Sequence, residues 1–315
     1  MDVSKVVVHS LDAHERRMVL AQAQVNLNSS KDIEDLILKL TKSFQSSSGI
    51  SRAILDEDSP LQNLIGQQFD FMEYSKNFAK TWFQSAMLSE DYLSSNLIFA
   101  QVDQGDTALL VCLEMRNRSA YIKIDGDFVH NDSVWNATFS NVKSGFVLDL
   151  NEGVLLVKTL MDTKDLMEAT LMCELKANSR ETFQVVDTLV DAISEQRNER
   201  PLMNTLRVKQ VVTDNQNFID TVRPDDLVRA VFEDLSETEL SLIHASLEEH
   251  HAEDDIVLKD LRKTTIASKH KIITESGIEI IVPIDSVDIS RILSVVEDDE
   301  GQTNIILNNI GKIIT

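Results

Sequence analysis

Residues 94–158 carry apolar residues with a period of two, and this pattern restricts the fold more than any other feature of the chain. The runs SNLIFAQVD, TALLVCLEM, AYIKID, GFVLDL and GVLLVKTL alternate or stay apolar over lengths typical of β-strands. The segments between them are short, and Asn151-Glu152-Gly153 is a hairpin signal. Strands joined by short turns pair antiparallel. The segment therefore predicts a largely antiparallel sheet.

A helical period flanks this sheet. Residues 29–49 place apolar side chains on one helical face, and residues 69–88 do the same with an aromatic stripe. Such a stripe could stack on nucleic-acid bases, but helical spacing favours packing in a core. Its members are Phe71, Tyr74, Phe78 and Trp82. Strands are predicted at 5–11 and 17–28, so this part of the chain is an α+β domain.

The remainder of the chain changes character near residue 200. Residues 178–200 are predicted to be helical, and Pro201 follows a charged stretch that indicates a domain boundary. Residues 224–262 predict acidic helices, and residues 268–315 predict two β-hairpins in one small antiparallel sheet. The predicted fold class is α+β: an N-terminal mixed domain with a largely antiparallel sheet (1–200), then a C-terminal domain (201–315) with an acidic helical segment and a small antiparallel sheet.

The net charge limits the partners that the protein can bind. The 315 residues include 52 acidic and 30 basic side chains, which gives a formal charge of −22. Neutralising DNA phosphates needs lysine and arginine, so this balance argues against coating DNA by charge alone. Because salt screens exposed charges beyond about 8 Å, a local basic face can persist on an acidic body. An acidic surface also suits a basic partner protein.

Basic residues gather in two places. One segment contains Arg262, Lys263, Lys269 and Lys271, and the other contains Arg116 and Arg118 near Tyr121. Either cluster is a candidate contact for DNA or for an acidic partner. The alternative is a solvated surface whose cations pair with the abundant carboxylates of the chain.

The sequence predicts no catalytic residues, no metal site and no cofactor. Phosphate-binding loops, the dinucleotide fingerprint and the hydrolase elbow are absent. Asp149, Glu174 and Lys176 match the loose pattern of a magnesium-dependent nuclease, with solvated surface charges as the alternative. The acidic stretch around His250 and His251 is interpreted as a solvated face, because adjacent helical residues point about 100° apart.

Other sequence features concern the compartment. Cys112 and Cys173 lie in apolar runs and are predicted to be buried free thiols. The first residues lack the pattern of a signal peptide, and no apolar run reaches the length of a membrane span. We therefore expect a cytoplasmic protein with no membrane partner.

Both ends of the chain resemble a known family. KVVVHSLD near the start, ESGIEIIVPID, and the closing DDEGQTNIILNNIGKI resemble the bacterial nucleoid-associated protein family, and the order of segments agrees over the whole chain. The resemblance implies a protein of the nucleoid that reaches DNA directly or through a basic DNA-bound protein. It transfers no catalytic residues.

The leading hypothesis is a non-enzymatic nucleoid-associated protein that binds DNA or DNA-bound protein partners. The alternatives are the magnesium-dependent nuclease and a homo-oligomeric scaffold that pairs through exposed sheet edges.

Overall fold

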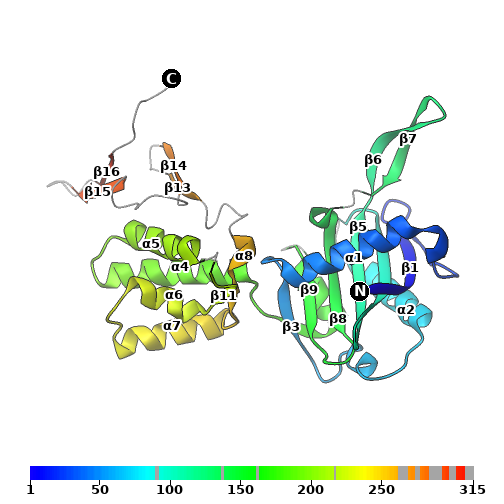
Figure 1. Ribbon diagram of the computed structural model, residues 1–315, viewed down its shortest axis with the longest axis horizontal. Coiled ribbons are helices and arrows are strands. Elements are labelled where there is room, and N and C mark those ends of the chain that lie inside the picture. The colour runs from blue at the N-terminus through cyan, green and yellow to red at the C-terminus, as the bar shows by residue number, and fades with distance from the viewer. Residues whose placement is uncertain are drawn as a thin grey trace. The chain divides into compact units, whose positions relative to one another are not determined.

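The computed structural model describes residues 1–88, 92–135, 138–160, 163–215, 218–261, 269–273, 277–283, 293–297 and 303–308. The chain groups into two compact units, Met1–Lys176 and Ala177–Thr315, each of which is described by itself (Figure 1). By its contacts, helix α4 (Ser179–Gln196) belongs to the second unit, whereas the sequence grouped it with the first domain. Grouping by contacts does not show which segments fold independently, so the domain boundary near residue 200 remains a prediction.

The first unit is built on an eight-stranded sheet, in which the strand order is β10-β3-β9-β8-β5-β4-β1-β2 and every pairing is antiparallel. The predicted α+β class and antiparallel sheet are thereby confirmed. The strands are β1 (Asp2–Asp12), β2 (Arg17–Val19), β3 (Ser51–Leu55), β4 (Ser95–Gln104), β5 (Thr107–Arg116), β8 (Val142–Asp149), β9 (Leu155–Lys158) and β10 (Cys173–Leu175).

The central strands are buried on both faces, which explains their nearly continuous apolar sequences. In β5, Leu110 and Cys112 face one core, while Val111 and Leu113 face the other. Helix α2 (Phe71–Ala86) and helix α3 (Lys164–Leu171) cover the first face, and helix α1 (Lys31–Ser46) covers the second (Figure 1). The unit therefore has three layers, with the sheet between helices.

The aromatic stripe of α2 packs inside the first unit, as predicted. Phe71, Phe78 and Trp82 are buried, and the rings of Phe78 and Trp82 stack with their centroids 6.2 Å apart. Asp70 caps the helix by accepting a hydrogen bond from the backbone N–H of Glu73. The stripe is thus not available for stacking on bases.

Several elements of the first unit differ from the sequence prediction. The strand predicted over residues 17–28 is limited to β2, because alanine, glutamine and asparagine there have low β propensity despite their alternation. The short strands β3 and β10 and the helix α3 were not predicted, since they are too short to reveal a period.

The hairpin of β6 (Arg118–Ile124) and β7 (Asp127–Val134) forms a two-stranded sheet of its own, which stands clear of the large sheet (Figure 1). Asp125 and Gly126 have φ values of 49° and 100° and join the strands as a two-residue turn. Aspartate followed by glycine is a strong signal for such a turn. The sequence prediction placed only the first strand and missed β7.

The second unit is mainly helical. Its helices are α4, α5 (Pro201–Asn215), α6 (Pro224–Val231), α7 (Glu237–Glu249) and α8 (Leu258–Leu261), and β11 (Thr221–Val222) pairs with β12 (Ile256–Val257). Capping boxes open α4 at Asn178 and α7 at Ser236. Pro201 starts α5, since proline fits the first turn of a helix.

A polar seam joins α4 to α5. The Lys209 ammonium lies 3.5 Å from Asp187, and the Thr205 hydroxyl donates to Asp191 at 2.6 Å. Burial raises the pKa of Asp187 to about 6 against the opposing effect of Lys209. The seam explains why α5 lacked a clear apolar face in the sequence, so that this helix was not predicted.

Two separate hairpins follow, instead of the single small sheet that was predicted. Strand β13 (Lys269–Ile273) pairs with β14 (Glu279–Pro283), and β15 (Leu293–Glu297) pairs with β16 (Thr303–Leu307). Val282 and Leu293 pack with Leu206 of α5 in a small core. Among the described helices, none is both long enough and apolar enough to cross a membrane.

Candidate functional site

The first predicted basic cluster lies where the large sheet passes into the β6–β7 hairpin. Arg116 ends β5 and Arg118 begins β6. The Arg118 side chain is exposed, whereas Arg116 is half-buried and its Nε has no hydrogen-bond partner among the described residues. The cluster therefore presents one exposed guanidinium at the base of the hairpin.

The second predicted basic cluster is described only in part. Arg262 and Lys263 lie outside the described residues, and Lys269 is placed only by its backbone in β13. The Lys271 ammonium lies 2.7 Å from the Glu279 carboxylate, and both side chains are about half exposed. One predicted contact residue thus has a neutralising partner, and binding by the two clusters stays a prediction.

The structure does not bring the predicted nuclease residues together. Asp149 accepts hydrogen bonds from the backbone N–H groups of Asn151 and Glu152, at 2.8 and 3.0 Å, and so shapes the turn into β9. Glu174 lies in β10, and β9 and β3 separate that strand from β8. Three strand spacings place the two backbones about 14 Å apart. Lys176 follows β10, so these groups do not converge on one ion.

The histidine-containing acidic stretch is a surface, as predicted. His250 ends α7 as its C-cap and His251 has a φ of 49°, and both side chains are exposed. Within the described ranges, no three histidine, cysteine or carboxylate side chains are grouped to hold a metal ion.

A continuous run of the second unit concentrates exposed acidic side chains. Residues 224–257 contain eleven acidic residues and one basic residue, Arg229. The exposed carboxylates of this run are called the acidic surface below. Its members are Asp226, Glu233, Asp234, Glu237, Glu248, Glu249, Glu253 and Asp255.

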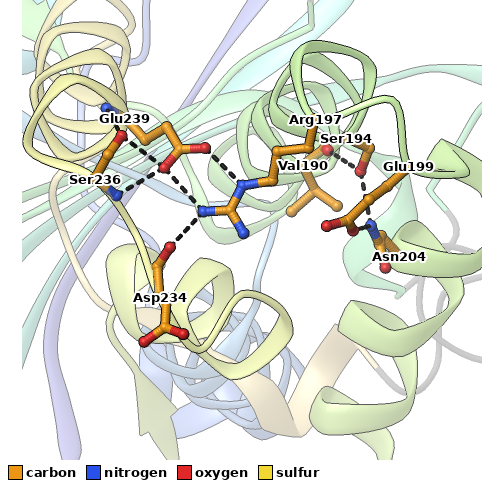
Figure 2. A network of polar contacts seen from close by, with 8 residues as sticks. All are labelled: Val190, Ser194, Arg197, Glu199, Asn204, Asp234, Ser236 and Glu239. Carbon is orange, nitrogen blue, oxygen red and sulfur yellow. Dashed lines mark hydrogen bonds and ion pairs between the residues drawn. The ribbon is translucent and has the colours of Figure 1, made fainter.

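One arginine ties this surface to the core of the unit. Arg197, at the C-terminus of α4, donates to both carboxylate oxygens of Glu239 at 2.6 and 2.9 Å (Figure 2). The Arg197 Nη2, which donates to Glu239, also donates to the Asp234 backbone carbonyl at 2.5 Å. The hydrogen bond from Arg197 lowers the pKa of Glu239 to about 2, and bonds from Ser236 add to this. The network fixes the start of α7 against the end of α4.

The same network extends along the end of α4. The Ser194 hydroxyl donates to the Val190 carbonyl at 2.6 Å, and the Asn204 amide donates to Ser194 and to Glu199 at 2.9 and 2.8 Å (Figure 2). These bonds satisfy buried polar groups where α5 begins. The surface is therefore carried by a fixed framework.

A shallow hollow opens on the acidic surface. Its volume is about 500 Å³, and it is lined by Arg229, Phe232, Glu233, Asp234, Leu235 and Ser236. The Arg197 guanidinium lies 5.0 Å from the centre of the Phe232 ring, which is 3% exposed, so this ring already has a cation from the same chain. The exposed carboxylates of Glu233 and Asp234, which line the hollow, suit a lysine or arginine side chain from a partner.

The first unit contains a buried polar cluster that the sequence prediction missed. The Glu114 carboxylate is 2% exposed and accepts hydrogen bonds from Tyr92 at 2.8 Å, from Ser95 at 2.9 Å, and from Ser144. Burial, with the charge of Glu114, raises the pKa of Tyr92 well above its ordinary value, so the phenol stays a donor. The signal was a glutamate inside the apolar run TALLVCLEM. The cluster joins β4, β5 and β8 and is closed to solvent.

His9 is a second buried polar group, in the run KVVVHSLD. Its Nδ1 accepts a hydrogen bond from the Ala21 backbone N–H at 3.1 Å, so Nε2 carries the proton and donates to the Ser75 hydroxyl at 3.1 Å. Burial lowers the pKa of His9 to about 4, and the charge of Lys76 adds to this. The histidine thus joins the start of the chain to α2.

These features define an α+β protein of two units, one built on an eight-stranded antiparallel sheet and one mainly helical with an acidic surface. The family model described as nucleoid-associated protein YejK (NA37) matches residues 7–314. The chain belongs to this family, which confirms the resemblance of its two ends. The match associates the protein with the bacterial nucleoid. A comparison with curated proteins finds no match.

Proposed function

We propose that the protein is a non-enzymatic nucleoid component that reaches DNA through a basic, DNA-bound protein. The acidic surface is the site of that contact. The observation that carries this proposal is the concentration of eleven acidic residues against one basic residue in residues 224–257.

The charge of the chain favours a basic protein over DNA as the direct partner. A chain with a net charge of −22 is repelled by DNA phosphates, whereas proteins that coat DNA present lysine and arginine. Complementary surfaces accelerate encounter and exclude wrong partners. The hollow would take a basic side chain of the partner, because the exposed Glu233 and Asp234 line it.

The framework beneath the surface supports the same proposal. The bidentate bond between Arg197 and Glu239 and the capping box at Ser236 hold α7 in one orientation. A helix held in one orientation loses less conformational entropy on binding than a mobile segment. Direct DNA contact by Arg116, Arg118, Arg262, Lys263, Lys269 and Lys271 is the competing version of the function.

Co-sedimentation of the purified full chain with isolated bacterial nucleoids tests the proposal. The variant Glu233→Gln/Glu248→Gln/Glu249→Gln removes three exposed charges, and none of these three side chains makes a hydrogen bond or an ion pair described above. At about 0.5–1 kcal/mol for each exposed charge pair, we expect binding to be weaker by roughly ten- to a hundredfold. The matched control Asp35→Asn/Glu57→Gln/Asp58→Asn removes three exposed charges from the first unit and should bind like wild type.

The competing version makes the opposite prediction. If the Glu233 variant sediments like wild type while Arg116→Ala/Arg118→Ala is lost from the pellet, the protein binds DNA directly and the acidic surface has no role in attachment.

A further inference from the structure

A hollow opens on the face of the large sheet that α2 covers, where the loop before that helix meets the start of β1 and the end of β4. Its volume is about 740 Å³, within the range of roughly 300–1,000 Å³ that holds small ligands. None of the described residues in its lining is acidic, although the chain has 52 acidic residues. This site is called the amide hollow below. The polar and aromatic side chains that line it are Lys5, Gln67, Gln68, Phe69, Gln101 and Asn151.

A shift in strand register turns Lys5 towards the amide hollow. The pairing of β1 with β4 shifts between Val3 and Lys5, where Ser4 is an extra residue. Val3 packs in the core on the α1 side of the sheet, whereas Lys5, two residues before Val7, shares the face on the α2 side. Gln101 is the direct cross-strand partner of Lys5, so the two side chains stand next to each other on that face.

Hydrogen bonds to the backbone fix another part of the lining. The Gly66 N–H donates to the Leu150 carbonyl at 2.7 Å, which ties the loop before α2 to the turn after β8. In that turn, the Asn151 side-chain amide donates to the Asp106 carbonyl at 2.9 Å, so the Asn151 side-chain oxygen stays available as an acceptor. Side chains from four separate segments are thereby held around one space before a ligand binds.

The polar side chains of the amide hollow lack partners within the described part of the chain. Gln67, Gln68 and Gln101 make no side-chain hydrogen bond there. The Lys5 ammonium forms no ion pair there and lies 5.8 Å from the centre of the Phe71 ring. Lys5 and Gln101 are half-buried, and polar groups in such positions usually have partners. Donors and acceptors that converge unpaired on one space are typical of a ligand site.

The chemistry of these groups matches a nucleotide. An ammonium binds phosphate, side-chain amides donate to and accept from the edges of bases, and aromatic rings stack on base faces. Phe69 is half-buried in the lining, and its ring meets the Tyr74 ring edge to face, with the centroids 5.9 Å apart. Among the described residues, no ring is stacked parallel on Phe69, which suits this ring to stack on a base.

We propose that the amide hollow binds a nucleoside monophosphate, with the phosphate on Lys5, the base on Phe69 and the edge of the base against the glutamine amides. Lys5 is the one cation among the described residues of the lining, so it matches a single phosphate. A chain with a net charge of −22 repels further phosphates, and AMP should therefore bind more tightly than ATP. Because the hollow is open to solvent, we expect a dissociation constant of about 0.1 mM for AMP.

Isothermal titration calorimetry of the full chain with AMP tests the proposal. We expect one site, and binding of adenosine and of inorganic phosphate should each be weaker than that of AMP by about tenfold or more, because each of them has only part of the matching groups. A single-stranded deoxyadenylate octamer tests the other source of the same chemistry, a DNA strand. It should bind no more tightly than AMP, since its additional phosphates meet an acidic chain.

Variants locate the site and separate its parts. Lys5→Gln removes the cation and should weaken AMP by about tenfold while leaving the binding of adenosine unchanged. Phe69→Leu should weaken both ligands, and Gln101→Ala, which leaves the core of the unit intact, should weaken AMP by roughly threefold. The matched control Lys42→Gln removes an exposed lysine of α1, on the other face of the sheet, and should bind AMP like wild type. Circular dichroism at wild-type strength confirms that each variant is folded.

Three results overturn the proposal. AMP could show no binding up to about 5 mM, Lys5→Gln could bind AMP like wild type, or inorganic phosphate could bind as tightly as AMP. An octamer that binds more than about tenfold tighter than AMP, and loses this binding in Lys5→Gln, would replace the nucleotide by a DNA strand. The amide hollow lies in the first unit and the acidic surface in the second, so the two proposals succeed or fail separately.

Discussion

Lowering the pH from 7 to 5 should destabilise the first unit through His9. Its imidazole is fully buried and neutral, with a pKa near 4 instead of 6.5. Because the folded value lies below the unfolded value, the unfolded chain takes up more protons between pH 6.5 and 4, and stability falls as the pH falls. Integrating between pH 7 and 5 gives a loss of about 2 kcal/mol from this residue.

Urea unfolding followed by tryptophan fluorescence measures this loss. Both tryptophans, Trp82 and Trp135, belong to the first unit, so their emission reports on that unit alone. His9→Asn is the control, since its amide oxygen can still accept from the Ala21 N–H but does not titrate. We expect the urea midpoint of wild type to fall about 1 M further than that of the variant.

The comparison removes the contribution of carboxylates, which titrate in both proteins. Equal losses of stability for wild type and His9→Asn would refute a buried neutral histidine, and so would a wild-type protein that becomes more stable at pH 5.

Three further predictions follow from individual contacts. In Gly145→Ala, the added Cβ would lie 2.3 Å from the Cys112 carbonyl oxygen. We therefore expect the free energy of unfolding to fall by about 3 kcal/mol and the Tm, followed by tryptophan fluorescence, to fall by roughly 8 °C. An unchanged Tm would contradict the close approach of β5 and β8. Glu239→Ala removes the capping box and the bond to Arg197, and it should lower the free energy of unfolding by about 2 kcal/mol, measured by far-ultraviolet circular dichroism. Glu239→Gln can still cap the helix and should lower it by about half as much. Equal losses in the two variants would rule out a separate capping contribution. Burial raises the pKa of Cys173 to about 12 and that of Cys112 well above its usual range. A thiol reagent at pH 8 should therefore label neither cysteine in the native protein and both in urea. Rapid labelling of the native protein would show that a thiol is accessible.

The sequence predicted the elements whose pattern is long enough to repeat. Strands β1, β4, β5, β8 and β9 and helices α1, α2, α4 and α7 bury apolar residues over several positions, so the period of these residues was visible in the sequence. Helix α5 was missed because the polar seam with α4 interrupts its apolar face, as at Lys209. Strands β3 and β10 are held by their neighbours in the sheet, and this tertiary pairing leaves little trace in such short sequences.

The charge of a sequence segment does not show whether its side chains are free to contact a partner, whereas their positions in the structure do. The sequence directed attention to basic clusters, yet Lys271 is paired with Glu279, and eight exposed acidic residues lie within residues 224–257 of the second unit. Strand β7 was missed although Asp125-Gly126 is a hairpin signal, because polar residues interrupt the apolar alternation of this strand. A glutamate in an apolar strand would have indicated the buried cluster of Glu114, but its hydroxyl partners come from other parts of the chain.

Binding of the purified full chain to a fluorescent 30-base-pair duplex, measured between 50 and 200 mM salt, tests the central claim most directly. Contact through a protein partner predicts no binding tighter than about 100 µM at 150 mM salt and no steep dependence on salt. A dissociation constant of about 1 µM or less at that salt, with a slope of log K against log salt of about −3 or steeper, would mean that several phosphates are neutralised and would contradict the account.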